Sequence, residues 1–204
     1  MQGKIFEGDY KTRCKNIDSL LCVGDTFDML KREIRLGDRH AVFYMIDGFL
    51  KGEVLEKIME FFLSLAPEDV PETYEDFLKK CTPYGDIVTV TTEQDFLHYV
   101  LSGLTGFVVE GYDEILVIDL RDYPSRSVEE PDKDKVLRGS RDGFVEAIMP
   151  NIALIRRRIR DVDLKFEIYS IGSSSRTDIS VVYMKDRVNQ KALSIIQKRL
   201  KKIS

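Results

Sequence analysis

The segment richest in groups that could do chemistry is 137–144, which reads Leu-Arg-Gly-Ser-Arg-Asp-Gly-Phe. A glycine-rich loop that opens a helix presents free backbone N–H groups at the positive end of the helix dipole, and these suit an anion. Arg138 and Arg141 would add charge-assisted donors beside Gly139. The carboxylate of Asp142 could instead occupy the helix N-terminus in place of an external anion. The residues thus allow an anion or nucleotide site, but they favour a rigid helix start held by an Arg–Asp network.

A second candidate is Asp119, which follows a predicted buried strand at 115–120. Its carboxylate could point into a cleft at the end of the sheet and act as one of a pair of acids. The alternative, which we favour, is that Asp119 caps the loop or pairs with Arg121 or Arg126.

A third candidate is the basic run at 156–160, on a predicted helix. Such a run can attract nucleic acid or lipid headgroups. Its arginines fan around the helix, however, and no aromatic platform for bases accompanies them. We therefore interpret Arg156, Arg157 and Arg158 as a solvated face or a contact with another subunit or a membrane surface.

Motifs for covalent or metal catalysis are missing from the sequence. It contains no G-x-S-x-G, H-E-x-x-H or P-loop motif. The serines at 173–175 have no histidine nearby to activate them, so a plain turn is expected. With only two histidines and no CxxC spacing among the three cysteines, we expect no metal cluster. An odd number of cysteines without a pattern suits a reducing compartment. We expect no cofactor and no enzymatic activity.

The composition, with 43% hydrophobic and 32% charged residues over 204 positions, is typical of a globular protein. The net charge of -4 argues against whole-protein attraction to nucleic acid. Charge is uneven, however. Residues 60–86 contain seven acids and two lysines, and residues 185–202 contain seven bases and one acid. These segments are either two solvated helices or opposite poles that steer docking between subunits.

Hydrophobic periodicity predicts an α/β protein of two small subdomains with mixed sheets, joined by a charged linker. Residues 1–120 would form the first subdomain, 121–141 the linker and 142–204 the second. Strands are expected at 41–46, 87–90, 107–109, 115–120, 164–170 and 179–184. Helices are expected at 54–65, 72–80, 91–104, 144–159 with a kink or break at Pro150, and 189–203; 27–36 is an edge strand or a short helix. No apolar run approaches the roughly 20 residues of a membrane span, and no signal peptide is evident, so we expect a soluble chain.

One stretch also resembles a known family. Residues 117–154 read VIDLRDYPSRSVEEPDKDKVLRGSRDGFVEAIMPNIAL and run into IRRRIRD. This resembles the A subunits of spore germination receptors, the GerA family, which carry an RG-x-R-(E/D)-G-F box and an N-x-A-L-I-R-R-R-I helix. The box corresponds to 138–144 and the helix to 151–159, with Pro150 as a departure. The wording is most similar to the stage V sporulation protein AF branch.

The resemblance implies a soluble N-terminal domain of a spore inner-membrane protein whose membrane part follows Ser204. It also implies a transporter-like B subunit and a lipoprotein C subunit as partners, and a homo-oligomer. The domain would then couple germinant sensing or ion release to subunit assembly. Arg138, Arg141 and Asp142 would clamp linker to helix, and Arg156, Arg157 and Arg158 would contact other subunits or the membrane. The alternative is a sensor that binds a germinant or nucleotide between two lobes.

Overall fold

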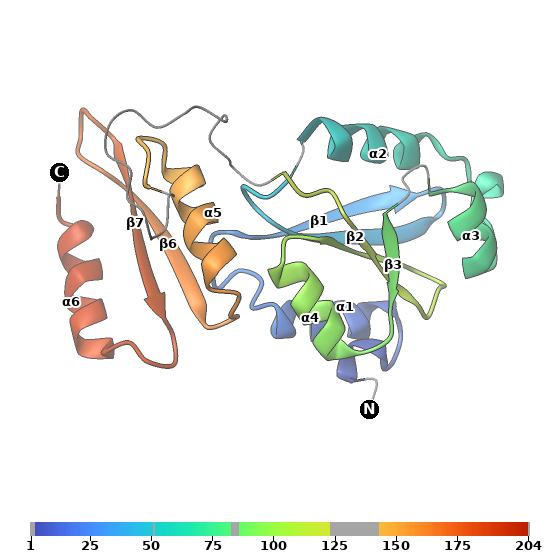
Figure 1. Cartoon of the computed structure of the whole chain (residues 1–204), viewed down its shortest axis with the longest axis horizontal. Coiled ribbons are helices and arrows are strands. Elements are labelled where there is room, and N and C mark those ends of the chain that lie inside the picture. The colour runs from blue at the N-terminus through green and yellow to red at the C-terminus, as the bar shows by residue number, and fades with distance from the viewer. Residues whose placement is uncertain (1–2, 51, 83–85, 123–142, 204) are drawn as a thin grey trace, which may run out of the picture.

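The chain folds into a larger and a smaller lobe, each built on its own β-sheet (Figure 1). The structure is a computed structural model that describes residues 3–50, 52–82, 86–122 and 143–203. We call residues 3–122 the larger lobe and residues 143–203 the smaller lobe. The subdomain boundaries expected at 120 and 142 stay a prediction, because the expected linker lies almost wholly outside the described residues.

The larger lobe is organised by a five-stranded sheet in the order β1-β2-β4-β5-β3. Its strands are β1 (Met29–Leu36), β2 (Arg39–Ile46), β3 (Ile87–Val90), β4 (Thr105–Val109) and β5 (Ile115–Ile118). Every pairing in this sheet is antiparallel, and so is the pairing in the smaller one. The α/β class is therefore confirmed, but the expected mixed sheets are wrong. Strands β3 and β4, which helix α4 (Glu93–Leu101) connects, point in the same direction. They do not pair with each other, because β5 lies between them and is antiparallel to both.

Helices cover both faces of this sheet. Helix α1 (Tyr10–Leu20) and α4 lie on one face, and α2 (Gly52–Ser64) and α3 (Tyr74–Lys80) on the other (Figure 1). Each face has its own apolar core, centred on Tyr44 and Phe96 on the α4 side and on Phe43 and Phe62 on the α2 side. Two short 3-10 turns, Lys4–Phe6 and Pro67–Asp69, complete the lobe.

The smaller lobe is also layered. Strands β6 (Leu164–Ile171) and β7 (Thr177–Met184) form a hairpin, with α5 (Ile148–Arg158) on one side and α6 (Gln190–Leu200) on the other. Helix α5 packs Ile152 against Leu164 and Phe166 of β6. Because α5 also faces the larger lobe, it lies between the two sheets (Figure 1).

Local signals explain where several helices begin. Asn189, the first residue of the helix expected at 189–203, caps α6 and accepts hydrogen bonds from the amides of the first turn. Thr92 caps α4, and its side chain accepts a hydrogen bond from the amide of Asp95. Pro150 sits in the first turn of α5, where an amide needs no partner within the helix, so the proline lies at the start of the helix rather than in its middle. Helix α1 is an element that the sequence interpretation missed.

Within the described residues, no helix combines the length and apolar character that crossing a membrane requires.

Candidate functional site at the junction of the lobes

The junction of the two lobes is centred on Arg156, a buried charged residue of α5 whose side chain is 1% exposed. Its Nε and Nη2 donate to the two carboxylate oxygens of Asp28 at 2.6 and 3.0 Å. The remaining donors reach the carbonyl oxygens of Asp161 at 2.7 Å and Leu164 at 2.9 Å. The guanidinium also lies 5.1 Å from the ring centroid of Phe166. Its contacts therefore join both lobes.

Asp28 is the counter-charge, and its side chain is fully buried. It directly precedes β1, and its backbone carbonyl accepts from the amide of Asp47. The carboxylate also accepts from the hydroxyl of Thr26 at 2.6 Å. Removing either partner would leave the other charge buried without a counter-charge, which strongly lowers the stability of the fold.

Backbone contacts reinforce this pair. The amide of Phe27 donates to the carbonyl of Phe166 at 2.9 Å, and the amide of Phe166 donates to the hydroxyl of Thr26 at 3.1 Å. Residues 26–28 thus run along the free edge of β6 and hydrogen-bond across the two lobes. Both main-chain and side-chain groups therefore contribute to the junction.

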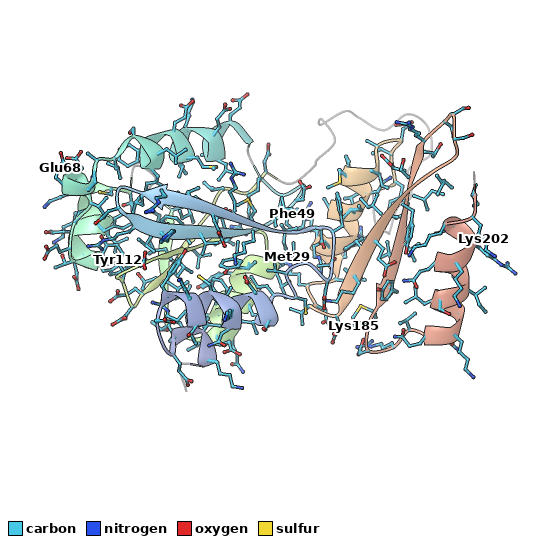
Figure 2. All side chains as sticks on the ribbon, turned by 180° about the vertical axis from the view of Figure 1, so that it is seen from behind. Met29, Phe49, Glu68, Tyr112, Lys185 and Lys202 are labelled. Atoms are coloured by element: carbon cyan, nitrogen blue, oxygen red, sulfur yellow. The ribbon has the colours of Figure 1, made fainter. Side chains whose placement is uncertain are left out.

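Two further contacts flank the buried pair. Lys185 Nζ lies 3.0 Å from a carboxylate oxygen of Asp25, and this hydrogen bond lowers the pKa of Asp25. On α4's side of the larger lobe, Arg160 donates to the hydroxyl of Ser102 at 3.1 Å. Figure 2 labels Met29, Phe49 and Lys185 near the middle of the molecule, where the lobes meet.

Close packing explains the glycine at position 48. Gly48 has a φ of 83°, which L side chains rarely adopt. A Cβ there would lie 3.2 Å from the Cβ of Ala153 on α5. Ala153 belongs to the core of the larger lobe, although its helix also packs on β6. Helix α5 is therefore shared between the α4-side core of the larger lobe and the core of the smaller lobe.

A hollow of about 350 Å³ opens beside the junction. It lies between residues 24–27, β6 and the end of α6, and Asp25, Glu167, Tyr169 and Lys201 supply its polar lining. Burial acts to raise the pKa of Glu167, but hydrogen bonds from Tyr169, Tyr183 and Gln197 outweigh it and lower that pKa.

The structure separates the residues that the sequence singled out. Asp119 pairs with Arg121 through both carboxylate oxygens, as the favoured alternative predicted. Arg157 and Arg158 are exposed on α5. Arg156 is instead directed inward, so the predicted surface contact does not fit this arginine. Arg138, Gly139, Arg141 and Asp142 lie outside the described residues.

Sequence reasoning missed Asp28, Thr26 and Asn151 as structural determinants. The side-chain amide of Asn151 holds both the N–H and the C=O of Val145 at 2.8 and 2.7 Å, and so orders the approach to α5. Asn151 is the first residue of the helix motif at 151–159, and this position was the feature of the sequence that could have identified it. Asp28 offered none, because its partner is 128 residues away.

The arrangement of both lobes has a counterpart among solved structures. It is similar to the crystal structure of the N-terminal domain of the A subunit of the Bacillus megaterium spore germinant receptor GerK3, with a TM-score of 0.69. The match covers 97% of this chain and 73% of that chain at 22% identity. At this identity the likeness establishes a shared fold, that of a germinant-receptor A-subunit domain.

Sequence comparisons give the family. Residues 17–204 match the family described as Bacillus/Clostridium GerA spore germination protein, and the chain belongs to that family. Stage V sporulation protein AF of Bacillus subtilis (strain 168) is 34% identical over 183 residues, which cover 89% of this chain and 37% of that protein. Spore germination protein KA of the same strain is 28% identical over 186 residues, covering 89% and 34%. The chain thus spans little more than a third of the length of these relatives.

Proposed function

We propose that this chain is a non-catalytic assembly and coupling module of a spore germination membrane protein. The observation that carries the proposal is the buried Asp28–Arg156 pair, which joins the lobes where a helix is shared by both cores. A module that transmits a change of state needs alternative arrangements with different contacts. The junction is the place where such arrangements would differ.

The proposed partners follow from the family. They are a transporter-like B subunit, a lipoprotein C subunit and further copies of the protein, with membrane attachment through a region beyond Ser204. We place the parent in the spore inner membrane and this module in a reducing compartment. The free thiols of Cys14, Cys22 and Cys81 are compatible with that compartment.

The contact surface that we assign to this role includes Arg157 and Arg158 on α5. We assign the linker–helix clamp to the segment 138–142, and a supporting ion pair to Asp119 and Arg121. The test is charge reversal of Arg157 and Arg158 to Glu in the full-length protein in spores. Germination, followed as the loss of optical density of a spore suspension, should slow, and recovery of the complex from spore membranes should fall.

A matched control for that test is Lys11→Glu, a charge reversal on exposed α1. It should leave germination and complex recovery unchanged. If the arginine reversals behave like the control, the role of this face in assembly is refuted.

A small-molecule sensor is the second candidate, favoured by the polar hollow beside the junction. Its volume falls at the lower end of the range of ligand sites. A saturable rise in the unfolding temperature with an amino acid, sugar or nucleotide, abolished by Glu167→Gln, would support it. No rise across such a panel would leave only the coupling role.

A further inference from the structure

The two ends of the molecule carry opposite charges. At one end, residues 58–80 of α2, α3 and the turn between them contain six acids and two lysines, which are the last two residues of α3; we call this the acidic end. At the other end, residues 187–203 of α6 and its flanks contain six bases and no acid; we call this the basic end. Figure 2 labels Glu68 and Lys202 at opposite extremes of the molecule. The charges are therefore separated by the whole length of the fold.

The charged side chains at both ends are largely exposed. Glu68, Asp69, Glu72 and Glu75 are exposed at the acidic end. Asp76 there is partly neutralised by Lys80, 3.4 Å away on the same helix. At the basic end the exposed cations are Lys191, Lys198, Arg199, Lys201 and Lys202. Most of this charge thus faces outward instead of pairing within the chain.

Among the described residues, the acidic end exposes one large aliphatic side chain and the basic end exposes three. Leu63, at the end of α2, is 58% exposed. On α6 only Leu193 is buried, whereas Ile195 is 51% exposed and Ile196 is 47% exposed, and Ile203 just beyond the helix is exposed as well. An apolar centre with a charged rim is the usual anatomy of a protein–protein contact.

From this complementarity we propose that the acidic end of one copy binds the basic end of a second copy. The contact is head-to-tail, so each copy keeps one free end, and repetition gives a ring or an open chain. The inference rests on the proposed assembly function and names the surfaces that one of its contacts uses. The electrostatic attraction would guide the ends together and the aliphatic side chains would be buried between them.

The test uses two double reversals in this chain. The acid-end variant carries Glu68→Lys with Glu72→Lys, and the base-end variant carries Lys198→Glu with Lys202→Glu. In sedimentation velocity at low salt, the unchanged chain should self-associate with increasing concentration. Each variant alone should raise the dissociation constant about tenfold or more. An equimolar mixture of the two variants should recover association, because each then meets an end of opposite charge.

Salt and a matched control sharpen this test. The screening length falls from about 30 Å at 0.01 M salt to about 3 Å at 1 M, so association of the unchanged chain should weaken at high salt. Lys11→Glu on α1 should associate like the unchanged chain. Circular dichroism should show equal unfolding temperatures for all variants, because the substituted side chains are exposed.

The competing occupant of the basic end is an anionic lipid surface. Vesicles of phosphatidylcholine and phosphatidylglycerol in equal parts, in a flotation assay, test for it. Binding that only the base-end variant loses, in a chain that does not self-associate, overturns the inference. So does a mixture of variants that stays dissociated. Neither result touches the proposed coupling function, whose test concerns the exposed arginines of α5 in spores.

Discussion

Replacing Arg156 by Met removes the cation of the buried pair while keeping much of the side chain's apolar length. Asp28 would then stay buried with Thr26 as its remaining side-chain donor, and the carbonyls of Asp161 and Leu164 would lose a donor each. Breaking a buried ion pair in this way costs about 3–5 kcal/mol. That is a large fraction of the roughly 5–15 kcal/mol by which domains are stable.

The assay is urea unfolding followed by far-ultraviolet circular dichroism, because the chain has no tryptophan to report by fluorescence. In a thermal melt followed by the same signal, Arg156→Met should lower the unfolding temperature by about 6 to 20 °C for a chain of this size. Asp28→Asn should cost a similar free energy, because it leaves the guanidinium without a counter-charge. The double variant should cost less than the sum of the two by about 2–3 kcal/mol.

The matched control is Lys11→Met, which removes a cation from an exposed position on α1. It should change the free energy of unfolding by no more than about 0.5 kcal/mol. Hydrogen exchange at the amides of Phe27 and Phe166 should accelerate in Arg156→Met and not in the control, since these amides bridge the lobes. Strictly additive costs for Asp28 and Arg156, or a cost below about 1 kcal/mol for Arg156→Met, would refute the reasoning.

Three further predictions concern the packing and titration of the two lobes. Gly48→Val forces a branched side chain into a positive-φ turn against Ala153, and should destabilise the fold by at least about 2 kcal/mol in urea unfolding. Asn189→Ala removes the cap of α6 and should cost about 1 kcal/mol, whereas Asn189→Asp should restore most of it in the same assay. Burial and the hydrogen bond to Glu167 raise the pKa of Tyr183 to about 12. Stability from this raised pKa is complete below about 10 and is lost as the pH rises toward 12. Glu167→Gln should lower this pKa in a spectrophotometric tyrosine titration, and an unchanged titration would contradict the contact.

Much of the secondary structure could be predicted because its signals are local. The stripe of α2, the hairpin of β4 and β5, and the Asn189 cap all depend on residues a few positions apart. Helix α1 was missed although Asp9 caps it and Cys14, Ile17 and Leu21 recur at helical spacing. Arg13 interrupts that apolar stripe with a charge, although its side chain is buried. It can be buried because its guanidinium donates to the backbone carbonyls of Tyr112 and Asp113, 99 and 100 residues away, and the local sequence gives no sign of those partners.

Long-range pairings could not be predicted in the same way. Nothing near β3 or β4 indicates that β5 will insert between them, which is why the expected mixed sheet was wrong. Likewise the basic run of α5 was interpreted as one outward face. Which of its arginines turns inward depends on Asp28, far away in the sequence.

The sharing of α5 has a consequence for how the chain can be divided. A cut at the predicted boundary before residue 142 would not yield two self-sufficient halves. The N-terminal piece would lose the helix that covers Gly48. It would also keep the Asp28 carboxylate without the guanidinium of Arg156, its counter-charge. The C-terminal piece would expose Ala153 and Arg156 to solvent, although both pack against the larger lobe in the intact chain. Such fragments should be recovered together or not at all, as in complementation of a split protein.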